Sequence, residues 1–294
     1  MRVGRVVFGD GVDTAVHHDG VWVRADACGP SAKDASVVDL LDRGEAVRED
    51  LERIDTELLL GTGDAVPEHA AQLRQPLDGP RAIIAVGLNY REHAREVSWE
   101  APSTPLLFAK WPSSLHGPYD PIALDPAISA NVDYEVELAA VIGRTTLDVA
   151  VEDALTHVAG YTVANDISAR DIQFSESQWT RSKSFDGFCP IGPWITTTDE
   201  VPDPQDLELS CWVNGERRQH ASTAQMIHGV AELVAFASRA TTLRAGDVIL
   251  TGTPSGVAMA SQEPHWLAPG DVLRTEVKSL GHLDNHMVDR TSQR

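Results

Sequence analysis

The chain has 294 residues, of which 42% are hydrophobic and 23% charged, so it can bury a sizeable core. Its formal net charge of -20 argues against nucleic acid and anionic membrane surfaces as partners. Three widely spaced cysteines argue against a disulfide framework and against a thiolate metal site. The sequence shows no secretory signal pattern and no apolar run of about 20 residues, so we expect a cytoplasmic protein.

Residues 1–76 are predicted to form a small N-terminal α/β domain. Short β-like segments at 3–8, 14–16 and 21–23 are separated by Gly-Asp and Asp-Gly turns. Apolar residues then recur at a helical period over residues 36–60. Prolines and an Asp-Gly-Pro turn follow and indicate a linker, so a second and larger domain is expected over residues 80–294.

The larger domain is predicted to be rich in short strands. Only two helical stretches stand out, at 151–158 and 223–240. The irregular order of helices and strands argues against a doubly wound parallel sheet. We therefore predict an α+β, β-rich fold, with a mixed β-roll or barrel covered by a few helices.

An alternation of acidic and apolar residues begins at Asp133. In a strand, Asp133, Glu135 and Glu137 would share one face, while the residues between them face the core. Neighbouring carboxylates repel one another, and a divalent cation would relieve that repulsion. An exposed edge strand whose acids prevent aggregation is the alternative. The apolar run that follows, up to Gly143, favours a core strand.

Asp166 follows another apolar run and is the natural third carboxylate. Three carboxylates, without cysteine or a close histidine cluster, suit Mg²⁺ or Mn²⁺ better than Zn²⁺. The other interpretation of Asp166 is a helix N-cap or turn residue.

Two further groups are candidates for chemistry. Residues 87–96 suit a loop that can become a short helix, and in a helix His93 and Glu96 lie on one face, where the carboxylate can orient the imidazole and the pair can activate water. Such pairs also occur on solvent-facing helices. Lys183 is one of only four lysines among 24 basic residues, which suggests that a compact ammonium is needed there.

These segments together resemble the fumarylacetoacetate hydrolase family, from about residue 80 to the C-terminus. The matching pieces occur in the family's order: Gly-Leu-Asn-Tyr…His-Ala…Glu (87–96), Pro-Leu-Leu-Phe…Lys (105–110), Tyr-Glu-Val-Glu-Leu (134–138), Asn-Asp-Ile-Ser-Ala-Arg-Asp (165–171), Lys-Ser-Phe-Asp (183–186), Gly-Asp-Val-Ile (246–249) and Thr-Gly-Thr-Pro (251–254). Acylpyruvate hydrolases and 2-hydroxyhepta-2,4-diene-1,7-dioate isomerases are the members it is most similar to.

The resemblance implies a role for each matched position. Glu135, Glu137 and Asp166 match the ligands of Mg²⁺ or Mn²⁺. His93 and Glu96 match a water-activating pair on a lid segment, and Lys183 matches a lysine that faces the substrate's carbonyl or enolate oxygen. The positions that hold the substrate carboxylate are matched by Arg170, Gln173 and Thr253. The family's fold is a mixed β-roll that is usually dimeric, so a homodimer is expected.

The predicted activity is metal-dependent hydrolysis of a C–C bond in a 2,4-dioxo acid, such as an acylpyruvate, through a metal-bound enolate. A bound metal would also allow so acidic a protein to accept a small anionic 2-oxo acid. One alternative is a decarboxylase or isomerase of a 2-oxo acid, of the oxaloacetate or 2-hydroxy-dienedioate type, at the same site. A non-catalytic metal-binding protein is a third hypothesis, which the presence of His93, Glu96 and Lys183 disfavours.

Overall fold

The computed structural model describes residues 1–290, and its N-terminal part combines a small sheet with short helices. The single predicted helical stretch over 36–60 is three helices, and the first of them begins at a capping box between Ser36 and Asp39. The elements of this part are β1 (Arg2–Phe8), β2 (Gly11–His18), β3 (Val21–Arg24), α1 (Ala25–Cys28), α2 (Val37–Asp42), α3 (Gly44–Leu51), α4 (Thr56–Thr62), β4 (Ala65–Pro67) and β5 (Leu73–Arg74).

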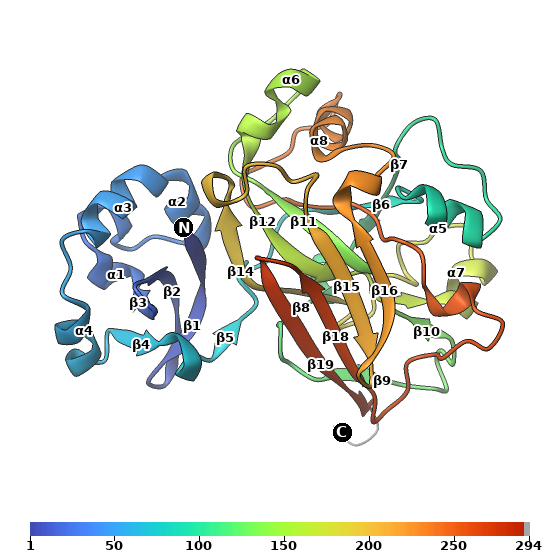
Figure 1. Ribbon diagram of the computed structural model, residues 1–294, viewed down its shortest axis with the longest axis horizontal. Helices are drawn as coiled ribbons and strands as arrows, with labels where there is room; N and C mark the ends of the chain where they lie inside the picture. The colour runs from blue at the N-terminus through green and yellow to red at the C-terminus, as the bar shows by residue number, and fades with distance from the viewer. Residues whose placement is uncertain (291–294) are drawn as a thin grey trace.

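The N-terminal sheet continues into the large sheet of the protein. Strand β1 pairs antiparallel with β14 (Cys189–Thr197), so that Arg2 lies opposite Thr196. The amino group of Met1 also donates a hydrogen bond of 2.6 Å to Oγ1 of Thr197. One hydrophobic cluster contains residues from both parts, among them Val3 and Ile195. The two parts are therefore packed against each other, as Figure 1 shows, and the division at residues 76 and 80 stays a prediction.

The large sheet runs in the order β4-β3-β2-β1-β14-β12-β11-β17-β6-β7. Strand β11 (Val136–Ile142) is buried at every residue, which explains why its sequence becomes wholly apolar after Glu137. The other strands of this sheet from the larger part are β6 (Ile83–Gly87), β7 (Leu106–Lys110), β8 (Leu115–His116), β12 (Val158–Asn165) and β17 (Val248–Leu250).

A second sheet of five strands, in the order β16-β15-β18-β19-β9, packs on the large one (Figure 1). Leu138 and Val163 of the large sheet share one core cluster with Leu209 and Leu273 of the second sheet. The strands are β9 (Ile122–Leu124), β15 (Glu208–Val213), β16 (Glu216–Ser222), β18 (Val272–Val277) and β19 (Gly281–Asp289). The short strands β10 (Val132–Asp133) and β13 (Ser168–Ala169) form a separate pair.

Helices of the larger part are short. Of the predicted stretch 223–240, only α8 (Val230–Ser238) is an α-helix, because a 3₁₀ turn at Thr223–Gln225 and an extended segment precede it. The stretch 151–158 is α6 (Val151–Ala154) followed by a 3₁₀ turn at Leu155–His157. The sequence missed α7 (Arg170–Ser175) as a helix, while α5 (Arg91–Glu96) lies where a helix was proposed. The predicted β-rich α+β fold is confirmed.

Candidate active site

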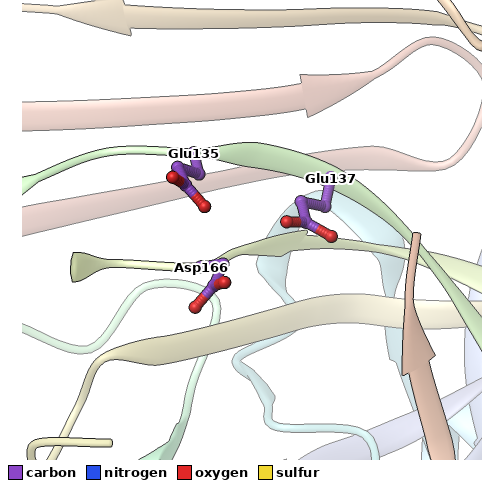
Figure 2. A group of neighbouring side chains, drawn as sticks. All are labelled: Glu135, Glu137 and Asp166. Atoms are coloured by element: carbon purple, nitrogen blue, oxygen red, sulfur yellow. The ribbon is translucent and has the colours of Figure 1, made fainter. Parts of the chain in front are cut away.

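Three carboxylates meet where β11 and β12 lie side by side. Glu135 immediately precedes β11, Glu137 lies within it, and Asp166 directly follows β12. The two strands are antiparallel with Val136 opposite Asn165, so that these positions come together in space (Figure 2). One oxygen from each carboxylate can be chosen so that all lie within 4.8 Å of one another, and the three residues are buried. The predicted grouping of Glu135, Glu137 and Asp166 is thus present.

Two cations neutralise Glu135. The ammonium of Lys183 lies 2.6 Å from Oε2 of Glu135 and 2.8 Å from Oδ2 of Asp166. Arg170 donates from Nη2 to Oε1 of Glu135 at 2.6 Å. Burial alone would raise the pKa of Glu135, but Lys183 and Arg170 outweigh burial and lower this pKa to about 2. For Lys183, burial opposes the charged form, yet Asp166 and Glu135 raise its pKa above the ordinary value.

Glu137 is the uncompensated member of the three. Its Oε2 accepts the backbone N–H of Gly252 at 2.6 Å. Burial, followed by the negative charges of Asp166 and Glu135, raises the pKa of Glu137 well above 4.5. A hard divalent cation, which prefers oxygen ligands, would remove this repulsion, so the donor set fits Mg²⁺ or Mn²⁺.

Sequence reasoning missed the role of Lys110. Its Nζ lies 2.6 Å from Oδ1 of Asp166 and 2.9 Å from the carbonyl oxygen of Phe188, and it also donates to the carbonyl oxygen of Lys183. Lys110 is 2% exposed. Its place in the Pro-Leu-Leu-Phe…Lys segment and the scarcity of lysine were the available signals.

Asp133 does not join the carboxylate group as the alternation suggested. The chain leaves strand geometry at Tyr134 and Glu135, between β10 and β11, and this break turns Asp133 away. Its carboxylate accepts Nε of Arg170 at 2.8 Å and the backbone N–H groups of Ala258 and Met259 at 2.8 and 3.2 Å. Asp133 therefore anchors Arg170 and the loop after β17.

The predicted pair of His93 and Glu96 is formed on α5. Nδ1 of His93 lies 2.8 Å from Oε1 of Glu96, while Oε2 of Glu96 accepts the backbone N–H of Gly256 at 2.8 Å. His93 is buried and faces the same pocket as Glu135 and Lys183. Because Nδ1 is held by Glu96, Nε2 is the ring nitrogen left for a ligand.

The pocket is lined by both polar and aromatic side chains. His93, Glu135, Lys183 and the three predicted carboxylate-binding residues, Arg170, Gln173 and Thr253, line it together. Arg170 donates to Oε1 of Gln173 at 2.9 Å, which fixes both side chains. Trp99 and Trp179 also line the pocket, and their rings stack with centroids 5.9 Å apart. The volume of the pocket, including its open mouth, is about 440 Å³.

Within residues 1–290, no helix is both long and apolar enough to cross a membrane.

The family model described as the fumarylacetoacetate (FAA) hydrolase C-terminal domain matches residues 82–288. The oxaloacetate tautomerase FAHD2B, mitochondrial, from Bos taurus is 41% identical over 256 residues, which are 86% of this chain and 80% of the relative.

Two solved structures resemble the whole chain. The fumarylacetoacetate hydrolase from Exiguobacterium antarcticum is 36% identical with a TM-score of 0.83, and the match covers 99% of this chain and 100% of the other. The maleylpyruvate hydrolase from Sphingobium sp. SYK-6, in complex with manganese(II) and pyruvate, is 31% identical with a TM-score of 0.77, covering 98% of this chain and 99% of the other. The chain therefore belongs to the fumarylacetoacetate hydrolase family.

Proposed function

We propose that this protein is a divalent-metal-dependent enzyme that moves a proton on a 2-oxo acid, interconverting the keto and enol forms of an oxaloacetate-type substrate. The observation that carries the proposal is the placement of His93, backed by Glu96, in one pocket with Glu135 and Lys183. The similarity to a bovine oxaloacetate tautomerase supports this reaction.

Glu135, Glu137 and Asp166 would hold the metal, with Mg²⁺ or Mn²⁺ as the proposed ion. When bound, such an ion supplies Lewis-acid chemistry toward the carboxylate and 2-oxo oxygens of the substrate. The manganese(II) in the related maleylpyruvate hydrolase structure supports the choice of ion. Arg170, Gln173 and Thr253, which line the same pocket, would bind the substrate carboxylate.

Proton transfer is assigned to His93. Its Nε2 takes the proton from C3 of the keto acid, the C3–H electron pair becomes the C2–C3 double bond, and the proton is delivered to the 2-oxygen. Glu96 stabilises the imidazolium that exists between these two steps. The ammonium of Lys183 stabilises negative charge as it develops on the 2-oxygen.

Hydrolysis of a C–C bond in a 2,4-dioxo acid is the second candidate. The similarity to a maleylpyruvate hydrolase favours it, and the same His93 could deprotonate a water instead of a carbon. The water oxygen would bond to the C4 carbonyl carbon, and the C3–C4 bond would break to give a carboxylic acid and the enol of pyruvate. Loss of CO₂ from oxaloacetate is the third candidate reaction at this site.

A substrate panel separates these reactions. The protein is supplied with Mg²⁺ or Mn²⁺ and assayed with enol oxaloacetate. Tautomerase activity is the rate at which the enol absorbance falls, after subtraction of the rate with the free ion alone. Pyruvate formation from oxaloacetate reports decarboxylation, and cleavage of acylpyruvates reports hydrolysis. We expect His93→Ala to abolish the active reaction and His286→Ala, at an exposed position of β19, to leave it unchanged. Metal-independent turnover, or full activity of His93→Ala, would contradict the proposal.

We expect a homodimer, which sedimentation of the purified protein would test. A cytoplasmic location stays a prediction, and the name of the bovine relative places that protein in mitochondria.

A further inference from the structure

Gln219 joins the two sheets beside the carboxylate group. It lies on β16 next to a β-bulge, where Cys211 pairs with Gln219 and Trp212 already pairs with Arg217. Its side chain is 1% exposed. Oε1 accepts the backbone N–H of Val136, the residue between Glu135 and Glu137, at 2.9 Å. Nε2 donates to Oγ1 of Thr253 and to the carbonyl oxygen of Pro254, both at 2.9 Å.

The protein backbone fixes the orientation of this amide. Val136 N–H can only donate and the carbonyl of Pro254 can only accept, so Oε1 must face Val136 and Nε2 must face Pro254. The hydroxyl of Thr253 therefore accepts a hydrogen bond from Nε2. Among residues 1–290 this hydroxyl has no protein acceptor for its own hydrogen, and Thr253 lines the pocket. Its hydrogen is available to a ligand.

We propose that Gln219 is a positioning residue that holds the Thr253 hydroxyl as a hydrogen-bond donor to the bound 2-oxo acid. Gln219 does not line the pocket itself and acts through Thr253. The inference rests on the proposed function in that the pocket must bind a 2-oxo acid. It adds a residue of the second sheet to the set that determines binding of that acid.

A similar amide nearby provides the matched control. Asn165 accepts the backbone N–H of Glu135 at 2.9 Å and donates from Nδ2 to Oγ1 of Thr275 at 2.9 Å. Thr275 is fully buried on β18 and does not line the pocket. Removing the Thr275 hydroxyl therefore disturbs an equivalent link between the sheets without removing a donor to the ligand.

The test is a double-mutant cycle on pyruvate binding to the full-length, Mn²⁺-loaded protein, measured by calorimetry. Thr253→Val should weaken pyruvate binding about tenfold, the scale of one hydrogen bond to a charged group. Thr253→Ser keeps the hydroxyl and should therefore bind pyruvate more tightly than Thr253→Val, while Thr275→Val should bind as the wild type does. Gln219→Met should weaken binding severalfold in the wild type and cause no further loss in the Thr253→Val background. If turnover is found, KM should rise in Gln219→Met with little change in kcat.

Equal losses from Gln219→Met in both backgrounds, or no loss in either, would show a merely structural role and overturn the inference. If Gln219→Met does not fold, equal pyruvate affinities of Thr253→Val and Thr253→Ser overturn it instead. Failure of the Mn²⁺-loaded wild type to bind pyruvate overturns the proposed function together with this inference, whereas intact binding with additive effects overturns this inference alone.

Discussion

The ammonium of Lys110 lies 2.6 Å from Oδ1 of Asp166, and neither side chain is exposed to solvent. The ammonium of Lys110 also donates to the carbonyl oxygens of Lys183 and Phe188. Lys110 therefore neutralises the buried charge at Oδ1 of Asp166, while Oδ2 is paired with Lys183. It also fixes the end of β7 against the carboxylate group.

Replacing Lys110 with Met should strongly destabilise the protein. The change leaves the carboxylate of Asp166 buried without this partner, and breaking a buried ion pair from one side costs roughly 3–5 kcal/mol. Urea unfolding measures the loss. Lys278→Met is the matched control, because Lys278 pairs with Glu208 at 2.8 Å on the surface, and little change is expected there. Similar unfolding midpoints for the two variants would contradict the assigned role of Lys110.

Glu137 should make the metal-free protein less stable as the pH rises. Since its pKa is raised in the folded state, that state binds the proton more tightly than the unfolded chain does. The resulting stability is present below the ordinary value of 4.5 and is lost as the pH rises through the raised pKa. Glu135 acts in the opposite direction, because its stabilisation is lost only as the pH falls toward about 2.

The expected result is that Glu137→Gln raises the stability of the metal-free protein around neutral pH and flattens its pH dependence. Thermal unfolding in EDTA at several pH values measures both effects. Glu137→Gln should also lose metal binding, because it removes one of the three carboxylates that would hold the ion. Repulsion among these carboxylates lowers stability but serves the function of the site. An unchanged or steeper loss of stability with rising pH would argue against a raised pKa.

Several residues of the candidate site have local signatures, and each signature taken alone also fits an ordinary structural role. Glu135 and Glu137 stand out by alternation within a strand, Asp166 by its place at the end of one, and His93 with Glu96 by helical spacing. The β-rich fold was likewise indicated by short apolar segments between turns.

Lys110 and Gln219 could not be found in this way. Lys110 lies 56 positions from Asp166, and in the large sheet β11, β17 and β6 stand between β12 and β7, so no local pattern places the two side chains together. Gln219 reaches Val136 from the other sheet, across 83 positions. Local periodicity does not specify which sheets pack together. The alternation also failed at Asp133, because a break between two strands redirects that side chain.

Metal binding should stabilise the protein and support its activity. A ligand that binds the folded state alone adds about 2.7 kcal/mol at 100 times its Kd. We expect Mn²⁺ to raise the Tm, EDTA to reverse the rise, and added Mg²⁺ or Mn²⁺ to restore turnover. Glu135→Ala should show neither the rise in Tm nor the restored turnover. Glu152→Gln, at an exposed position of α6, should behave as the wild type. A rise in Tm that persists in Glu135→Ala would place the ion elsewhere.

Glu96→Gln should lower kcat with little effect on KM. The amide cannot offset the positive charge of the imidazolium, so proton transfer by His93 loses part of the roughly 10²–10⁴-fold that a general base contributes. Steady-state kinetics on the active substrate measure the change. Glu92→Gln is the control on the same helix, because Glu92 is exposed and pairs with Arg95. Equal kinetics in the two variants would remove Glu96 from the mechanism.

Gly252→Ala should destabilise the protein more than Gly270→Ala does. Both glycines have φ near +100°, at 98° and 103°, where a side chain is strained by about 1–3 kcal/mol. At Gly270 a Cβ meets no atom within 4 Å, whereas at Gly252 it would lie 2.7 Å from Cβ of Asn89. Crowding should add a further cost of about 1–3 kcal/mol at Gly252. The N–H of Gly252 donates to Glu137, so Gly252→Ala should also bind Mn²⁺ more weakly. Gly270→Ala should retain the wild-type affinity for Mn²⁺. Equal urea midpoints and equal Mn²⁺ affinities would show that the loop after β17 does not hold Glu137 in place.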